Sequence, residues 1–356
     1  MPNDHMSIHE RRIWASWRTR ACAAGWCVGT QIFLAGCAVG MPLALNSTWL
    51  AALTTLPFCA WLVSRSHRHL QSAQEHAFAA RLGYLLLALA LLCSGAFACA
   101  SLVGFAAQTL VQQARPIWTE AAALIGVLLC ALSGGAGTAR LCFALRYIAA
   151  VLVLGLSLTA VPMRMPVGLF PILGAGAEPL GYAALSMLFS TAPVLMLMLP
   201  PPELTDSPSR LLFPPVRFFL VRVFIGALVG ILLLFLTSTC TTYESIARSS
   251  EWGARLRMAA GNQPHEGVLQ MILILIKLIA MLLLSANMIC AGKQALGMAI
   301  PALRRKAPGL LASVLLLSGA LLLPLLFGDA PLLIATPLIS VPTVLSAWLL
   351  GRRRRT

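Results

Sequence analysis

The sequence predicts an all-α polytopic membrane protein with about ten transmembrane helices. Three observations support this fold class: the composition, the number of long apolar stretches, and the alternation of basic residues between them. Of the 356 residues, 59% are hydrophobic and only 10% are charged, whereas a soluble domain carries roughly 25% charged residues. The composition therefore excludes an ordinary soluble domain.

The apolar stretches are each long enough to cross the roughly 30 Å hydrocarbon core of a bilayer as a helix. Backbone groups in lipid must pair within their own segment, which favours helices over loops. The ten predicted spans are residues 23–46, 47–64, 82–111, 117–135, 142–163, 179–200, 215–240, 267–291, 308–327 and 331–350. They form a transmembrane domain over 23–350, preceded by a cytoplasmic segment, 1–22, and followed by a basic cytoplasmic tail, 351–356.

The basic residues between the spans predict the orientation. When the gaps are assigned alternately to two sides, twenty of the 26 Lys and Arg residues fall on one side, which includes both termini. The other side holds Arg115, Arg164, Arg248, Arg255 and Arg257. By the positive-inside rule, the protein is an integral inner (cytoplasmic) membrane protein with both termini in the cytoplasm. The net charge of +15 is then an interaction with anionic lipid headgroups, and no nucleic-acid partner is predicted.

Two long gaps suggest an internal repeat. The cytoplasmic gap 65–81 reads as a surface helix, and the external gap 241–266 reads as an amphipathic helix. They follow the second and seventh spans, so they are five spans apart and on opposite sides of the membrane. This pattern predicts a five-plus-five inverted repeat, with a first repeat at 23–163 and a second at 179–350. A chance coincidence of two long loops is the alternative.

The first helix of each such repeat is often broken near the middle of the membrane. The first span carries Gly25, Gly29, Gly36 and Gly40 and ends near Pro42, and the sixth span contains the stretch 189–193, which ends in a proline. A proline inside a helix removes a backbone donor and kinks the helix. We therefore predict interruptions near Ala35–Gly36 and Ser190–Pro193 that face each other across a small cavity. Close helix packing is the alternative explanation for the glycines.

Four segments resemble the spore-germination permeases, which are the GerAB-type B subunits of germinant receptors within the amino acid–polyamine–organocation superfamily. They are Gly36–Pro42, Asn46–Leu53, the Gly-x5-Arg element Gly134–Arg140, and Leu169–Leu180. The resemblance follows the order of spans over nearly the whole chain, and it implies a LeuT-like fold.

The chain also departs from the family pattern. Ala136 stands where the family often has a glutamate, and Ser190–Pro193 replaces a Gly-Glu pair in helix 6. A lysine typical of helix 8 does not align with Lys277. The resemblance therefore supports the fold better than the ligand chemistry.

The resemblance implies a small amino acid as ligand, bound between the broken helices 1 and 6. Small side chains there leave the backbone accessible, and hydroxyl groups add hydrogen bonds. The expected ligand-binding residues are Leu34, Ala35, Gly36, Phe189, Ser190 and Thr191. The expected partners are the A and C subunits of a germinant receptor, and the expected location is the spore inner membrane.

Lys277, the one basic residue assigned to neither side, lies about ten residues into the predicted span 267–291, and no acidic residue shares its depth. A charged side chain in the membrane is costly and usually faces the protein interior. In the inverted-repeat fold, helix 8 borders helix 1 at a cation site, so Lys277 is a candidate ion-site or proton-site residue. The alternative is that its side chain extends to the membrane interface.

Two further functions remain open: an ordinary amino acid permease acting as a secondary transporter, and a structural membrane subunit of a larger complex. The scarcity of buried carboxylates favours ligand sensing over proton-coupled transport. No catalytic constellation, phosphate-binding loop or cofactor motif is present, so no enzyme is predicted. The ten cysteines form no CxxC pair and read as apolar packing residues, and the histidines of gap 65–81 read as a solvated helix, so no metal site is predicted.

Overall fold

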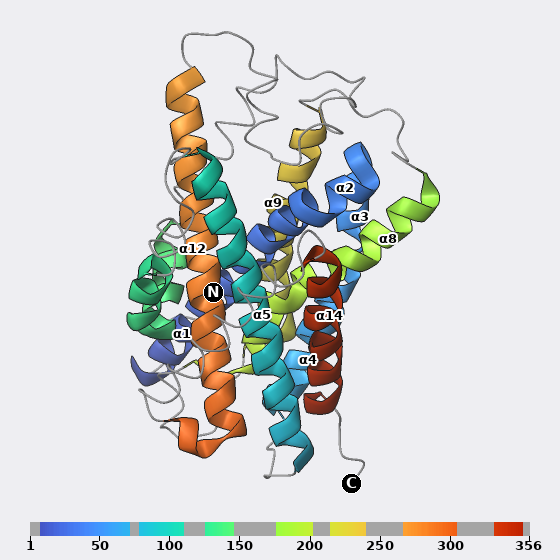
Figure 1. Cartoon of the computed structure of the whole chain (residues 1–356). Coiled ribbons are helices and arrows are strands. Elements are labelled where there is room, and N and C mark those ends of the chain that lie inside the picture. The colour runs from blue at the N-terminus through green and yellow to red at the C-terminus, as the bar shows by residue number, and fades with distance from the viewer. Residues whose placement is uncertain are drawn as a thin grey trace.

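The computed structural model describes residues 8–71, 78–109, 125–145, 176–201, 214–239, 266–304 and 331–351. Within these ranges all regular structure is helical (Figure 1). Four helical segments are long and apolar enough to cross a membrane, or five if one sharply bent pair is a single span. The predicted all-α polytopic membrane fold is confirmed. The predicted span 308–327 and nearly all of the gap 241–266 lie outside the described residues.

The helices follow the predicted spans closely along most of the described chain. In order they are α1 (Ile8–Ala35), η1 (Gly36–Gly40), α2 (Met41–Ala44), η2 (Leu45–Ser47), α3 (Thr48–Leu53), α4 (Thr55–Gln71), α5 (Phe78–Thr109), the pair Ile125–Leu132 and Gly134–Leu145, α8 (Ala177–Met187), η5 (Leu188–Met198), α9 (Val216–Thr239), α12 (Glu266–Ala299), η7 (Pro301–Arg304) and α14 (Pro331–Leu350). The gap 65–81 is shorter than expected, because α4 continues to Gln71 and α5 begins at Phe78.

The first helix begins well before the predicted span. α1 starts at Ile8, and Trp17 is fully buried with its ring edge-to-face against Phe219 of α9, 5.7 Å between ring centroids. The residues ahead of the first span therefore pack on the bundle as one continuous helix with it.

Four glycines bring α1 and α9 into backbone contact. A Cβ atom added at Gly25 would overlap the Arg222 carbonyl oxygen, and one added at Gly29 would overlap the Gly226 carbonyl oxygen. The same holds in reverse for Gly226 and Gly230, which face the carbonyl oxygens of Gly25 and Gly29. Small residues four apart on each helix allow this close approach. Close packing, the alternative considered above, is thus correct for the first two glycines of the first span.

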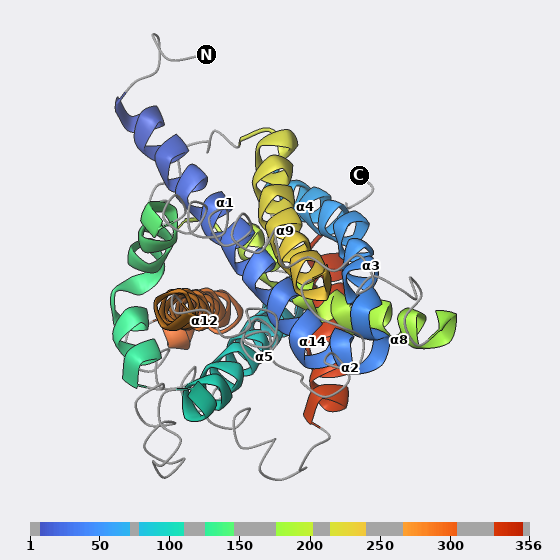
Figure 2. The ribbon, with the colours of Figure 1, turned by 90° about the horizontal axis from the view of Figure 1, so that it is seen from above.

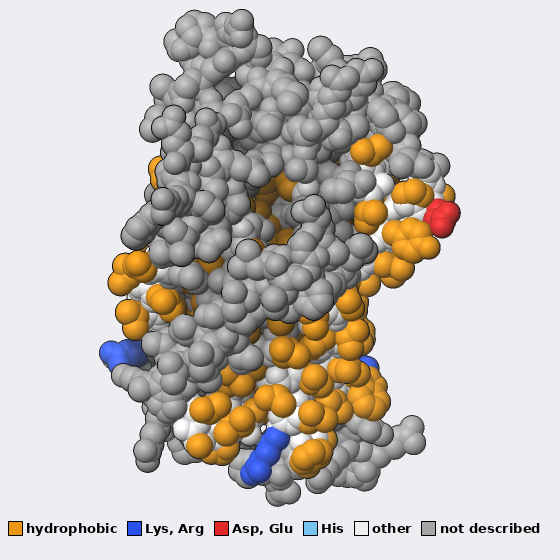
Figure 3. Space-filling view, viewed as in Figure 1, with side chains coloured by type: hydrophobic (Ala, Val, Ile, Leu, Met, Phe, Trp, Pro, Cys, Tyr) orange, Lys and Arg blue, Asp and Glu red, His pale blue; other side chains and the backbone are white. Residues whose placement is uncertain are grey.

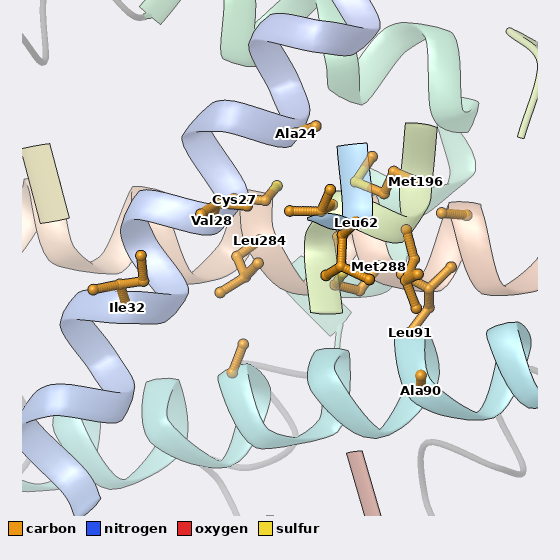
Figure 4. Packing of buried hydrophobic residues seen from close by; sticks show 14 of the residues in the cluster. Ala24, Cys27, Val28, Ile32, Leu62, Ala90, Leu91, Met196, Leu284 and Met288 are labelled. Atoms are coloured by element: carbon orange, nitrogen blue, oxygen red, sulfur yellow. The ribbon is translucent and has the colours of Figure 1, made fainter. Parts of the chain in front are cut away.

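A second layer is built from α5, α12 and α14. α12 runs along α5, and a Cβ atom added at Gly292 would lie 2.6 Å from Cγ of Leu92. In the view from above, α12 is seen end-on between α5 and the bent helix pair (Figure 2). Residues of α1, α4, α5, α12 and η5 fill the space between the layers with a buried apolar cluster, including Cys27, Leu91, Met196 and Met288 (Figure 4).

The turn between the fourth and fifth spans is tighter than predicted. The helices Ile125–Leu132 and Gly134–Leu145 meet at a 102° bend, and Gly134 adopts a φ of 78°. Glycine is favoured there because it has no Cβ to clash in the left-handed region. The second helix therefore begins at Gly134 and not at residue 142, and the Gly-x5-Arg element forms its first turns.

The outer surface is apolar where lipid would cover it. On α9 the exposed residues Val221, Ile225, Leu228 and Leu232 recur every three or four positions, which gives one apolar stripe along the helix. In the space-filling view most described side chains are hydrophobic, and the few charged ones lie at the edges of the face (Figure 3).

The ends of α4, α5 and α14 are joined by a buried histidine. The Nδ1–H group of His69 donates to the Leu350 carbonyl (3.2 Å), and its Nε2 atom accepts the hydroxyl hydrogen of Tyr84 (3.0 Å). Because the side chain is buried, the prediction that this segment is a solvated helix is wrong at His69. Both ring nitrogens have partners when the imidazole is neutral.

Acid should weaken this end of the bundle. Desolvation by burial lowers the pKa of His69 from 6.5 to about 4, although the hydrogen bond to Leu350 opposes the shift. Above pH 6.5 the ring is neutral in both the folded and unfolded states, so the pKa difference does not lower the free energy of unfolding. Below pH 6.5 the unfolded state binds the proton first, and the folded state becomes less stable relative to it. We expect a loss of stability approaching about 3 kcal/mol between pH 6.5 and 4. Thermal unfolding across that range should show a smaller loss for His69→Asn than for the native protein; equal slopes would contradict this assignment.

Candidate substrate site at the breaks of α1 and α8

The first helix changes form where the sequence predicted a break. The α-helix ends at Ala35, and the next five residues, Gly36–Gly40, form a π-helical turn before α2 begins at Met41. π-helical turns inside α-helices are rare, and those that occur often lie at functional sites. Pro42 has no N–H group, so it leaves a carbonyl of this turn without its helical donor. The predicted interruption near Ala35–Gly36 is confirmed.

The sixth span changes form as well. α8 ends at Met187 and continues as η5, an eleven-residue 3₁₀ segment that contains Pro193. Runs of 3₁₀ helix longer than three or four residues are uncommon and often mark a hinge. In a 3₁₀ helix residue 193 would donate to the carbonyl of Ser190, and a proline cannot do so. The sixth span therefore changes helix form between Met187 and Leu188, just before the predicted interruption at Ser190–Pro193, and it continues through Pro193 as a 3₁₀ segment.

The two interruptions lie against each other. Ala35 packs with Phe189 and Ala192 of η5 and with Ile339 of α14 in one buried cluster. At the far end of the π-helical turn, a Cβ atom added at Gly40 would lie 3.3 Å from the sulfur of Met187, the last residue of α8. These segments are far apart in the sequence, and the fold brings them into contact.

Phe189 is held from a third helix. Its ring meets Phe97 of α5 edge-to-face, with 5.1 Å between ring centroids. Phe189 is fully buried, as are Ala35, Ser190 and Thr191. Water reaches none of these four side chains, and the small cavity between the two helices stays a prediction.

The other two expected residues lie around the helix from this contact. Leu34 belongs to the main apolar core, and a Cβ atom added at Gly36 would point into the side chain of Leu234 on α9. The structure therefore brings together Ala35, Phe189, Ser190 and Thr191 and places Leu34 and Gly36 on neighbouring faces.

The two hydroxyl groups of η5 donate within their own helix. Ser190 Oγ donates to the Met187 carbonyl (2.6 Å), and Thr191 Oγ1 donates to the Leu188 carbonyl (2.7 Å). A hydroxyl oxygen that donates can still accept a hydrogen bond. These groups are thus suited to accept from a cationic or amide group of a ligand, together with the Ser190 carbonyl.

Sequence reasoning missed a buried amide on α1. Gln31 is fully buried, and neither its amide oxygen nor its amide nitrogen has a hydrogen-bond partner. On α12, Asn287 is satisfied on one side only: Nδ2 donates to the Leu283 carbonyl (2.8 Å) and contacts the sulfur of Cys142 (3.2 Å), while Oδ1 has no partner. A glutamine inside an apolar span was the available signal for the first of these.

A buried arginine on α1 joins the end of η5 to α12. Arg20 Nε donates to the Met196 carbonyl (2.9 Å) near the end of η5, and Nη2 donates to Oε1 of Gln294 on α12 (3.1 Å). Gln294 in turn donates to the Pro200 carbonyl (2.6 Å). The predicted cytoplasmic Arg20 is in fact 6% exposed, and it joins α1, η5 and α12.

The candidate ion-site lysine cannot be placed in the same detail. Lys277 lies on α12, whereas its side chain is outside the described part of the structure. Its role at the contact between helices 1 and 8 stays a prediction.

The fold is similar to that of solved manganese transporter structures. Three crystal structures of point mutants of the Eremococcus coleocola manganese transporter each align with 98% of this chain and 79% of their own. They are a glutamate-to-alanine mutant (TM-score 0.57, 16% identity), a histidine-to-alanine mutant (0.54, 15%) and a glutamate-to-glutamine mutant (0.52, 16%). No protein-family model and no curated protein sequence matches the chain. The chain therefore has a polytopic transporter fold.

Proposed function

We propose that this protein is a permease that binds a small amino acid between the interrupted helices α1 and α8–η5. The observation that carries the proposal is the packing of Ala35 against Phe189 and Ala192 at the two points where the helices lose their α-helical form. Carbonyls without helical donors and hydroxyl oxygens that can still accept favour an ammonium group. The small side chains of Ala35, Ser190 and Thr191 favour a small ligand.

The finer proposal is that ligand binding signals spore germination, with A and C subunits of a germinant receptor as partners. It rests on the resemblance of Gly36–Pro42 and Leu169–Leu180 to the GerAB-type permeases. Secondary transport of the amino acid is the alternative, and uptake of the bound amino acid into proteoliposomes would favour it. A structural subunit would bind no amino acid at all.

Manganese, the cargo named for the similar structures, is a poorer match. Divalent manganese prefers carboxylate, carbonyl and water oxygens. Residues 34–41 and 188–198 contain no aspartate, glutamate or histidine. Their side chains suit an organic ligand held largely by backbone groups.

We also propose that the basic end of the bundle is cytoplasmic. The end of α4, the start of α5 and the end of α12 lie toward the end of the bundle where α14 ends (Figure 1). These helix ends carry Arg68, Arg81 and Lys293 respectively. An excess of basic residues marks the cytoplasmic side of inner-membrane proteins.

The proposed function is tested by the size preference of the site. Phe189→Leu removes part of a ring that closes the contact, so the ratio of leucine to alanine affinity should rise about tenfold, because a pocket discriminates single methylene groups by about 1–3 kcal/mol. Binding is measured by calorimetry on purified protein in nanodiscs, with glycine, alanine, serine, valine and leucine as probes.

A matched control separates selectivity from lost packing. Phe219→Leu makes the same change in another fully buried phenylalanine that also has an edge-to-face partner, Trp17. It should lower stability similarly and leave the leucine-to-alanine ratio unchanged. Native protein that binds none of the five amino acids contradicts the proposed function, and equal ratios in the two variants place the site away from Phe189.

A further inference from the structure

The unpartnered amide of Gln31 is an unexplained cost in the core. A buried donor or acceptor without a partner loses its hydration with nothing in return, and Gln31 buries both its amide nitrogen and its amide oxygen in this way. The hydroxyl groups of Ser94 and Ser285 are also without partners, but a hydroxyl can rotate toward its own helix backbone. The amide oxygen of Gln31 finds no donor in its own helix, because the N–H groups of a helix interior already donate to backbone carbonyls, so it calls for a ligand or a water.

Gln31 lies on the face of α1 that contacts η5. Residues 20, 31 and 35 are separated by eleven and four positions, which at 3.6 residues per turn places them on one face of the helix. Arg20 on this face bonds the Met196 carbonyl of η5, and Ala35 on the same face packs against Phe189 and Ala192 of η5. Gln31 therefore lies between two contacts that α1 makes with η5.

The segment of η5 between those contacts offers a complementary backbone. It holds Pro193, which has no N–H group to donate to the Ser190 carbonyl in the 3₁₀ pattern. The residues 188–198 carry no charged side chain. A ligand group that reached this space would meet one amide donor, one amide acceptor and a backbone acceptor, all of them neutral.

We infer that Gln31 is a specificity-determining residue that binds the side chain of a polar, uncharged amino acid, one carrying a hydroxyl or carboxamide group. Such a group both donates and accepts, as the glutamine amide does. This inference rests on the proposed amino acid site and extends it from Ala35 toward Arg20. A site with a buried polar group rejects an analogue that lacks the matching group, because the buried group is then left unpaired.

The experiment compares pairs of amino acids of similar shape: serine with alanine, threonine with valine, and asparagine with leucine. We expect native protein in nanodiscs to bind at least one polar member more than tenfold tighter than its apolar counterpart. Gln31→Leu keeps the size and removes both polar atoms, so it should abolish that preference. Thr30→Val is the control, since Thr30 is half-buried and its hydroxyl donates to the Trp26 carbonyl of its own helix (2.9 Å).

Thermal unfolding without ligand separates recognition from a structural role. Because Gln31 has no protein partner to lose, Gln31→Leu should unfold at the same temperature as native protein or higher. A clear decrease would show that Gln31 is satisfied structurally, for example by a buried water, and would overturn the inference. Native protein that binds amino acids without preferring a polar member, or a Gln31→Leu variant that keeps the preference, overturns it as well. Binding of no amino acid by native protein instead ends the proposed function itself.

Discussion

Replacing Gly29 by valine should separate α1 from α9 and leave little folded protein. The added side chain would meet the carbonyl of Gly226, which is backbone and cannot rotate away. Overpacking a well-packed contact costs about 1–3 kcal/mol when flexible side chains can adjust, and more when they cannot. The helices would have to move apart along the whole crossing, which also holds Trp17 against Phe219.

The measurement is the yield and melting temperature of detergent-purified protein. Gly29→Ala should already lower the melting temperature by several degrees, and Gly29→Val should give aggregated or degraded protein. Gly181→Ala is the matched control, because an added Cβ there has no neighbour within 4 Å and alanine is the better helix former. A Gly29→Val variant as stable as Gly181→Ala would show that the two helices do not cross this closely.

The glycines of the first span illustrate what sequence can and cannot separate. Four glycines and a nearby proline predict a break somewhere in the helix, and the break is found after Ala35. The same pattern also fits a small-residue packing face. Only the position of α9 shows that Gly25 and Gly29 are packing residues, while Gly36 both lies against Leu234 of α9 and begins the π-helical turn. A partner helix that comes much later in the chain cannot be located from local spacing.

The candidate site was predictable to the same degree. The backbone features of the site follow from local chemistry, since Pro193 must interrupt the helical hydrogen bonds of its own segment. The partners of each side chain do not. Ala35 packs with Phe189 where both helices change form, whereas Leu34 and Gly36 differ from Ala35 by a rotation of about 100° about the helix axis and lie on other faces. The sequence shows that Gln31 is a polar residue in an apolar span, but it does not show whether another residue forms a hydrogen bond with its amide.

Arg20→Met should loosen the basic end of the site while the rest of the bundle stays folded. Arg20 joins the Met196 carbonyl and Gln294, and hydrogen bonds that involve a charged group contribute about 1.5–3 kcal/mol each. Methionine keeps a long apolar side chain and removes both bonds. The hydrogen bond from Gln294 to the Pro200 carbonyl, just beyond η5, and the apolar packing of Met196 and Met198 would remain.

This loosening is measured by chemical labelling of Thr191→Cys in a background without native cysteines. Thr191 is fully buried, so maleimide should react slowly in the otherwise native protein and at least tenfold faster with Arg20→Met, when added from the basic side of the membrane. Gln294→Leu should give part of the increase because it removes the hydrogen bond from Arg20 Nη2 to Gln294. Arg18→Met is the control, since Arg18 is exposed and its guanidinium lies 5.3 Å from the Phe143 ring centroid.

Equal labelling rates in Arg20→Met and Arg18→Met would show that the arginine does not hold the site closed. Faster labelling at an unchanged melting temperature supports a local opening, because general unfolding would also lower the melting temperature. Arg20→Lys keeps the charge and loses the planar fork that reaches two acceptors. An intermediate labelling rate for this variant would show that the paired hydrogen bonds of the guanidinium contribute to protecting position 191. A rate equal to that of Arg20→Met would show that the positive charge alone gives no protection.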